Sequence, residues 1–260
     1  MAVILHIETS TRVCSVGLSR EGKWLAVRED RSQNYSHSAL LTVFMEEVMK
    51  EAAVTADGID AVAVSRGPGS YTGLRIGVSA AKGFCYALDI PLIAVDTMKA
   101  LAAVTAASLP SGPASVSGKP KVTAADIPVQ PDEPNTGGSS DILYCPMIDA
   151  RRMEVYYALF TPGLKEVKPT AAEVITEKTF REVLEHHQVI FCGDGAEKCR
   201  QVIDSPAAVF IPDSLPTVKG MLPLAEDQFN REDFVDVAYF EPYYLKDFVA
   251  GKPKVKGLYS

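Results

Sequence analysis

Short hydrophobic runs and amphipathic stretches alternate regularly along the first hundred residues of the chain. The apolar or alternating runs predict a meander of three strands, over residues 3–9, 13–19 and 24–29. The patterns that follow predict helices at 36–52, 72–88 and 97–107 and strands at 60–65 and 92–95. The order β-β-β-α-β-α-β-α implies an α/β domain whose later strands pair in parallel through right-handed crossovers.

The pattern breaks over residues 108–141, which are rich in Pro, Gly, Ser and Thr and almost lack large apolar side chains. Such a segment cannot bury enough surface to offset the conformational entropy lost on ordering. We therefore expect an N-terminal domain at 1–107, a flexible low-complexity insertion at 108–141 and a C-terminal domain at 142–260.

The C-terminal domain repeats the opening pattern in a weaker form. A hairpin is predicted over 142–149 and 154–160, followed by helices at 176–187, 195–203 and 221–230 and strands at 189–192 and 207–211. Two successive units that open with a hairpin and then alternate helix and strand indicate a duplicated fold.

Composition restricts the function. The formal net charge is −7, and an acidic surface repels phosphate backbones, so any role in nucleic-acid chemistry is expected to run through a partner. The five cysteines are scattered without a Cys-x-x-Cys pair, which indicates buried free thiols in a reducing cytoplasm. We expect neither a secretory signal nor a membrane-spanning segment.

A glycine-rich turn at residues 65–70 lies between a predicted strand and a predicted helix, but it lacks the spacing of known phosphate-binding loops. In the helix that follows, Gly73, Gly77 and Ala81 recur every four residues and form a ridge of very small side chains. Interior glycine costs a helix about 1 kcal/mol relative to alanine, and close approach of another backbone would compensate. The preceding helix has a broad apolar surface, which fits either burial between the sheet and the insertion or a partner-binding face.

Four stretches of the sequence carry a family resemblance: ILHIETSTRVCSVGLS, GPGSYTGLRIGVSAAKGF, MIDARRMEVYYALF and EPYYLKDF. With them the chain resembles the TsaB (YeaZ) family over both domains, leaving out mainly 108–141. The resemblance implies two ribonuclease H-like domains of the actin–Hsp70–sugar kinase superfamily, the second smaller and degenerate.

The resemblance also implies a function and its partners. Members of this family are non-catalytic scaffold subunits that pair with the TsaD transferase and the TsaE ATPase to make threonylcarbamoyladenosine 3′ of the anticodon. We expect tRNA to be contacted only indirectly, and the free chain to be able to form a homodimer. The expected interface comprises Leu41, Phe44, Met45, Val48, Gly73, Ile76, Gly77, Ala80 and Ala81. Gly77→Leu is predicted to abolish pairing while leaving the monomer folded.

No catalytic set and no metal site are expected in this chain. The positions that match the two metal-binding histidines of TsaD are Thr97 and Leu101, and a leucine cannot bind a metal. The resemblance places a vestigial nucleotide site at Glu8, Thr9, Ser10, Asp149, Gly193 and Gly195. No cofactor is expected to be required, although ATP or ADP with Mg²⁺ could bind weakly or at an interface. The alternative function is an ATP-dependent kinase or ATPase that uses Glu8 and Asp149 with Mg²⁺.

Overall fold

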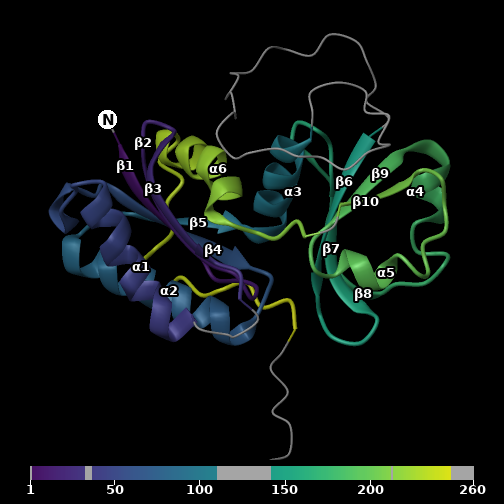
Figure 1. Ribbon diagram of the computed structural model, residues 1–260, viewed down its shortest axis with the longest axis horizontal. Helices are drawn as coiled ribbons and strands as arrows, with labels where there is room; N and C mark the ends of the chain where they lie inside the picture. The colour runs from purple at the N-terminus through teal and green to yellow at the C-terminus, as the bar shows by residue number, and fades with distance from the viewer. Residues whose placement is uncertain (1, 33–36, 110–141, 212, 247–260) are drawn as a thin grey trace, which may run out of the picture.

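A computed structural model describes residues 2–32, 37–109, 142–211 and 213–246, and in this part of the chain ten strands form two five-stranded sheets (Figure 1). The first sheet has the order β3-β2-β1-β4-β5. An antiparallel meander comprises β1 (Val3–Glu8), β2 (Cys14–Arg20) and β3 (Lys23–Asp30). Strand β4 (Ala61–Gly67) pairs with β1 in parallel, and β5 (Leu92–Asp96) pairs with β4 in parallel. The predicted strands and their pairing in this half are confirmed.

The second sheet repeats this topology. Its order is β10-β9-β6-β7-β8, with β6 (Ile142–Asp149), β7 (Glu154–Phe160) and β8 (Glu166–Val174) antiparallel. Parallel to β6 run β9 (Gln188–Cys192) and β10 (Ala208–Ile211). The duplicated strand order predicted from the sequence is therefore present, although β8 was missed. Most of β8 is exposed or half-buried and it contains Pro169, which is tolerated because β8 is an edge strand.

Two pairs of helices cover the two faces of the first sheet. α1 (His37–Glu51) and α2 (Tyr71–Leu88) pack on the outer face, and the short 3₁₀ helix η1 (Ala56–Gly58) lies between α1 and β4. α3 (Thr97–Ser108) and α6 (Val218–Asn230) lie between the two sheets (Figure 1). Helix α3 packs on β6 and β7 as well as on α6, so it joins the two halves of the molecule.

The helices of the second half are shorter than predicted. α4 (Arg181–His186) and α5 (Ala196–Cys199) replace the longer helices expected at 176–187 and 195–203. At the start of the predicted 176–187 helix, the Thr176 backbone N–H donates to the Thr179 hydroxyl at 3.0 Å. Such local side-chain hydrogen bonds compete with helix formation, which explains the late start of α4.

The C-terminal part of the chain returns to the first sheet, which corrects the predicted domain at 142–260. Val218, Met221 and Ala225 of α6 fill the core beneath β1, β4 and β5. Further on, Val235 bridges to Leu92 of β5, and the Tyr243 backbone N–H donates to the Arg66 carbonyl at 2.7 Å. Within the described residues, 218–246 therefore pack with the N-terminal half.

Two predictions fall largely outside the described residues, namely the insertion at 108–141 beyond residue 109 and the start of the first long helix at Ser36. All five cysteines are described; they are free and buried, as predicted. No helix in the described ranges is long and apolar enough to span a bilayer.

Candidate partner-binding face and interdomain cleft

The turn that opens α2 packs tightly against the turn between β1 and β2. The Ser70 backbone N–H donates to the Ser10 carbonyl at 2.6 Å, and the Thr9 hydroxyl donates to the Gly73 carbonyl at 2.8 Å. A Cβ placed on Gly73 or Gly77 would overlap atoms of Thr9. The small residues of the ridge therefore let the chain's own β1–β2 turn approach the helix backbone.

This packing corrects part of the predicted partner interface. Gly73, Gly77 and Ala81 are buried within the chain, so they offer no surface to another protein. The same packing argues against the prediction that Gly77→Leu leaves the monomer folded, because a Cβ at Gly77 would overlap the Thr9 hydroxyl.

The predicted contacts on α1 are corrected in the same way. Leu41, Met45 and Val48 are buried in the core above the first sheet. Phe44 is half-buried against the same core and is the one predicted residue of α1 that keeps accessible surface. The broad apolar surface of α1 is thus explained mainly by packing on the sheet.

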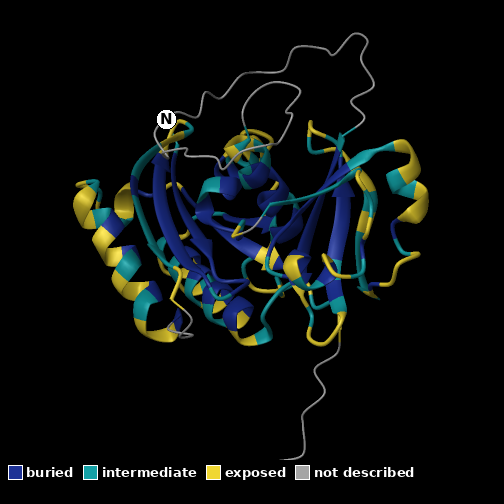
Figure 2. Cartoon of the chain, turned by 45° about the vertical axis from the view of Figure 1, so that its right-hand side comes forward, coloured by how far each residue is buried: buried dark blue, intermediate teal, exposed yellow. Residues whose placement is uncertain are grey.

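A second set of residues on α2 faces outward, where Figure 2 shows both outer helices exposed on one side and buried on the other. The members are uncharged and exposed or half-buried, and we call them the outer stripe: Thr72, Ile76, Ser79, Ala80, Gly83, Tyr86 and Ala87. A Cβ on Gly83 would meet no atom within 4 Å, and Tyr86 is 85% exposed. Ile76 and Ala80 are the predicted interface residues of α2 that belong to this stripe.

The two cations of α2, which contains no Asp or Glu, are held to one side of the outer stripe by the C-terminal segment. The Arg75 guanidinium lies 4.2 Å from the centre of the Tyr71 ring and donates to the Tyr244 hydroxyl at 3.3 Å. The Lys82 ammonium donates to the carbonyls of Ala238 and Phe240 at 3.1 and 2.9 Å. The outer stripe is therefore a surface of small uncharged groups beside a fixed pair of cations.

A cavity of about 610 Å³ lies where the β1–β2 turn meets the second half of the molecule. Arg12 of that turn lines it together with Asp149, Gly193 and Asp194, so the structure brings two of the six predicted nucleotide-site residues to one cavity. Gly195 lies behind them, where a Cβ would press on the backbone of β6. Glu8, Thr9 and Ser10 do not line this cavity and are fully buried.

Asp149 is already engaged by groups of its own chain. Its Oδ1 accepts the Arg151 backbone N–H at 2.6 Å and forms an ion pair with the Lys198 ammonium, also at 2.6 Å. Its own backbone N–H donates to Asp194 Oδ1 at 3.0 Å. Burial raises the pKa of Asp194, and the nearby Asp149 carboxylate raises it further.

Glu8 lies in a different environment. Its Oε1 accepts the Ser10 backbone N–H at 2.7 Å, while Oε2 has no hydrogen-bond partner in the part of the chain that the structure describes. Burial raises the pKa of this carboxyl above its ordinary value of 4.5. Glu8 is fully buried and does not line the cavity, and Asp149 is paired with Lys198, so these two residues do not fit a magnesium–nucleotide site.

The positions that match the TsaD histidines are used for packing. Leu101 is fully buried beside the second sheet, and the Thr97 hydroxyl accepts the Gly67 backbone N–H at 3.1 Å. Across the described residues, no group of three or more His, Cys, Asp or Glu side chains is placed to hold a metal ion.

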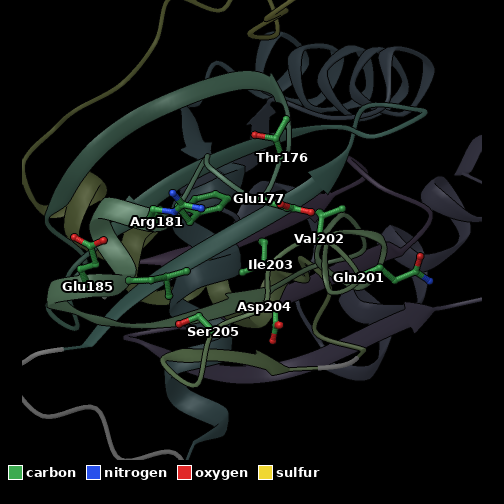
Figure 3. Close-up of a pocket in the computed structure, with 11 residues that line it drawn as sticks. Thr176, Glu177, Arg181, Glu185, Gln201, Val202, Ile203, Asp204 and Ser205 are labelled. Atoms are coloured by element: carbon green, nitrogen blue, oxygen red, sulfur yellow. The ribbon is translucent and has the colours of Figure 1, made fainter.

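A second cavity of about 520 Å³, which was not predicted, lies in the half of the molecule that contains the second sheet (Figure 3). Arg181 and Glu185 line it from α4, and Asp204 and Ser205 line it from the segment before β10. Its apolar floor includes Phe180, which is 3% exposed and belongs to the core of this half. No sequence motif marks this hollow.

Comparison with known proteins gives similarities to a family model and to named relatives. Residues 31–124 match the family model of TsaD, described as tRNA N6-adenosine threonylcarbamoyltransferase. The tRNA threonylcarbamoyladenosine biosynthesis protein TsaB of Escherichia coli (strain K12) is 27% identical over 257 residues, which cover 96% of each chain. The tRNA N6-adenosine threonylcarbamoyltransferase of Bacillus thuringiensis (strain Al Hakam) is 39% identical over 108 residues, but these cover only 36% of this chain and 32% of that one.

The fold has a counterpart among solved structures. A Pseudomonas aeruginosa protein with similarity to peptidase YeaZ superposes with a TM-score of 0.73 at 22% identity, covering 95% of this chain and all of that one. Two sheets of the same strand order with helices between them define a two-domain α/β fold, which this solved structure shares. Among the sequence relatives described above, TsaB is similar along nearly the whole of both chains. The chain is thus similar to the TsaB (YeaZ) proteins in sequence along nearly its whole length and in fold.

Proposed function

We propose that this chain is the non-catalytic scaffold subunit of a complex that makes threonylcarbamoyladenosine in tRNA. In this proposal it pairs with a TsaD-type transferase through the outer stripe of α2 and the adjoining surface of α1, and a TsaE-type ATPase joins the complex. Support comes from the full-length similarity to TsaB and from the match of residues 31–124 to the TsaD model. Because tRNA modification of this kind takes place where tRNA is used, we place the chain in the cytoplasm.

The main structural evidence for the proposed interface is Gly83. Of the three glycines in α2, Gly73 and Gly77 are explained by the close approach of Thr9, whereas Gly83 lies exposed with open space around it. An interior helical glycine that packs against nothing costs about 1 kcal/mol relative to alanine. Close approach of a partner's backbone at Gly83 would account for that cost.

The composition of the surrounding surface fits a protein partner. Tyr86 is 85% exposed and Val43 of α1 is 45% exposed, although both are large enough to contribute to a core. Exposed tyrosines are typical anchors at interfaces, and depletion of charge is typical of interface centres. The outer stripe provides an uncharged centre, with Arg75 and Lys82 fixed at its edge.

The chemistry is assigned to the partner. Leu101 and Thr97 stand where TsaD has its two histidines, and Asp149 is paired with Lys198. These observations support a chain that needs no cofactor of its own, with any ATP or ADP and Mg²⁺ bound at an interface with its partners. They do not favour the alternative of an ATP-dependent kinase or ATPase.

The experiment compares Gly83→Leu with Gly83→Ala and with Gly163→Leu, which adds the same side chain at an exposed glycine of the other half. Size-exclusion chromatography with the TsaD-type transferase of the same organism measures pairing. Gly83→Leu should weaken pairing by roughly tenfold to a hundredfold, the effect of overpacking a close contact. Gly83→Ala should remain folded, with a thermal midpoint at or above that of the wild type.

Two further readouts decide the proposal. In vitro threonylcarbamoylation of tRNA by the reconstituted subunits should fall in proportion to pairing in Gly83→Leu and stay normal in Gly163→Leu. Light scattering of the free chain tests whether the same face also pairs two copies. Normal co-elution and normal modification by Gly83→Leu would show that the outer stripe is not the interface.

A further inference from the structure

The turn between β6 and β7 has an unusual backbone. Arg151 and Arg152 both have positive φ angles, 75° and 52°. Two successive residues of positive φ characterise the tightest hairpin turns, where Asn and Gly are preferred because side chains such as arginine are disfavoured there. Since both residues are exposed, packing of their side chains does not explain the conformation.

Lys198 of α5 reaches beneath this turn and binds three oxygen atoms. Its ammonium group donates to Asp149 Oδ1 at 2.6 Å and to the carbonyls of Arg152 and Glu154 at 2.7 Å each. An ammonium group has three donors, so all of them are used. The side chain is only 20% exposed, although lysine is usually well exposed.

The position of Lys198 is fixed by its neighbours in α5, which are buried in the core. Cys199, the next residue, is fully buried in the core of this half, and Ala196 at the start of α5 is 2% exposed. The turn is tied to the same point, because the Arg151 backbone N–H donates to the Asp149 oxygen that Lys198 binds. The lysine therefore connects a rigid core position to both ends of the turn.

A carboxylate and two backbone carbonyls that surround one positive centre are the ligand types that hard cations take in proteins. We propose that the Lys198 ammonium fills a cation site built from Asp149 and the carbonyls of Arg152 and Glu154. In this role it replaces a bound metal ion, holds the Arg151–Arg152 turn in its left-handed conformation and excludes a divalent ion from Asp149. Removing the ammonium leaves an oxygen-lined site that accepts a small alkylammonium ion.

Limited trypsin digestion tests this directly, because trypsin cleaves after arginine and the turn contains two. Lys198→Ala should be cut at Arg151 or Arg152 about tenfold faster than wild type, as expected when a local contact that closes the turn is lost. Lys165→Ala, a lysine removed from an exposed position in the same half, is the matched control and should keep the wild-type rate. Equal cleavage of the two variants would overturn the proposal.

Chemical rescue then identifies the site as one for a cation. Propylammonium, the fragment that Lys198→Ala lacks, should slow cleavage of this variant toward the wild-type rate, whereas tetramethylammonium, which has no N–H donor, should not. Lys198→Met fills the space with a neutral chain and should be cut quickly with or without propylammonium. Equal protection by both ammonium ions would contradict a hydrogen-bonded site.

A measurement on the wild-type chain keeps the proposal testable if the alanine variant does not fold. Reductive methylation followed by mass spectrometry reports how accessible each lysine is. Lys198 should react about tenfold more slowly than Lys165, because its three donors are occupied and its side chain is mostly buried. Equal labelling of the two lysines would exclude a filled site.

Discussion

The β1–β2 and β6–β7 turns occupy the same place in two sheets of the same strand order, yet their chemistry is opposite. Each follows a first strand that ends in an acid, Glu8 in one and Asp149 in the other. Glu8 is buried and forms no ion pair with any described residue, while Asp149 lies near the surface and is paired with Lys198. Two turns in the same topological position therefore differ in their electrostatic environment. The element that packs over each turn determines whether its acid is buried or paired with a cation.

The covering elements account for the difference. The first turn lies under α2, an 18-residue helix whose glycines admit Thr9, and Ser10 is tied to Ser70. The second turn is approached by α5, which has four residues and supplies one long side chain rather than a face. A buried turn needs small residues opposite it, whereas an exposed turn is held by a charge.

The largest expected effect comes from disrupting the contact between the β1–β2 turn and the glycines of α2. Gly77→Leu should destabilise the chain by roughly 5 kcal/mol or more, the range of severe core mutations, because a side chain would overlap the buried Thr9. Urea denaturation or the soluble yield measures this effect. Gly83→Leu, which adds the same side chain on the open side of α2, is the control and should be at least as stable as the wild type. A cooperatively folded Gly77→Leu variant of near-normal stability would show that close packing of Thr9 against Gly77 is not required.

The next effect concerns His6, two residues before Glu8. Burial lowers the pKa of His6 from 6.5 to about 3. Below pH 6.5 the unfolded chain takes up a proton that the folded chain does not, so stability is lost as the pH falls. Between pH 6.5 and 4.5 this amounts to about 2 kcal/mol, since the slope approaches about 1.4 kcal/mol per unit only below pH 6.5.

Urea denaturation at several pH values measures that slope, which should be reduced in His6→Gln. His186→Gln, which removes an exposed histidine of the other half, is the control. The matching residue of β6 is Met147, which does not titrate, so the acid sensitivity is expected to come from the first sheet. An unchanged slope in His6→Gln would place the sensitivity elsewhere.

Neutralising the two acids should act in opposite directions. Burial raises the pKa of Glu8, so the stability gained by protonating it is present below pH 4.5 and is lost as the pH rises through the folded-state value. Glu8→Gln should therefore become more stable relative to wild type as the pH rises. Asp149→Asn should instead lose up to about 1 kcal/mol at pH 7, because its pair with Lys198 is partly exposed.

Denaturation of both variants at pH 4 and pH 8 provides the comparison. If Glu8→Gln gains no stability relative to wild type between pH 4 and pH 8, or if Asp149→Asn loses none at pH 8, the contrast between the buried and the paired acid is wrong. Leu101→Met, a near-isosteric change in the core beside α3, serves as the control for unspecific effects of substitution.

How far the sequence predicts this molecule depends on the range of the interactions involved. The strands and helices of the first half were predicted within a few residues, because each has a clear apolar period and a distinct end. Strand β8 was missed because an edge strand with Pro169 and mostly exposed residues has little period. The return of α6 and residues 231–246 to the first sheet was also missed, since it depends on long-range packing.

The same limit applies to the candidate site. Spacing correctly indicated that Gly73, Gly77 and Ala81 form one ridge and that another backbone approaches it. Spacing alone does not say whose backbone that is, and the structure shows the chain's own Thr9. Gly83 falls three residues from Ala80 and off that ridge, so only its open surroundings in the structure distinguish it. Lys198 carries no sequence signal, because its three acceptors come from a turn more than forty residues earlier.

The smallest expected effect is on the second turn itself. Replacing Arg151-Arg152 with Asn-Gly places the residues preferred at successive positive φ angles where arginines now stand. The Lys198 contacts to the backbone carbonyls and to Asp149 remain available, so the double variant should gain up to about 1 kcal/mol of stability. A higher urea midpoint with an unchanged denaturant slope is the expected result. A loss of stability would mean that the arginine side chains, and not only Lys198, hold this turn, and would remove the contrast with the first turn.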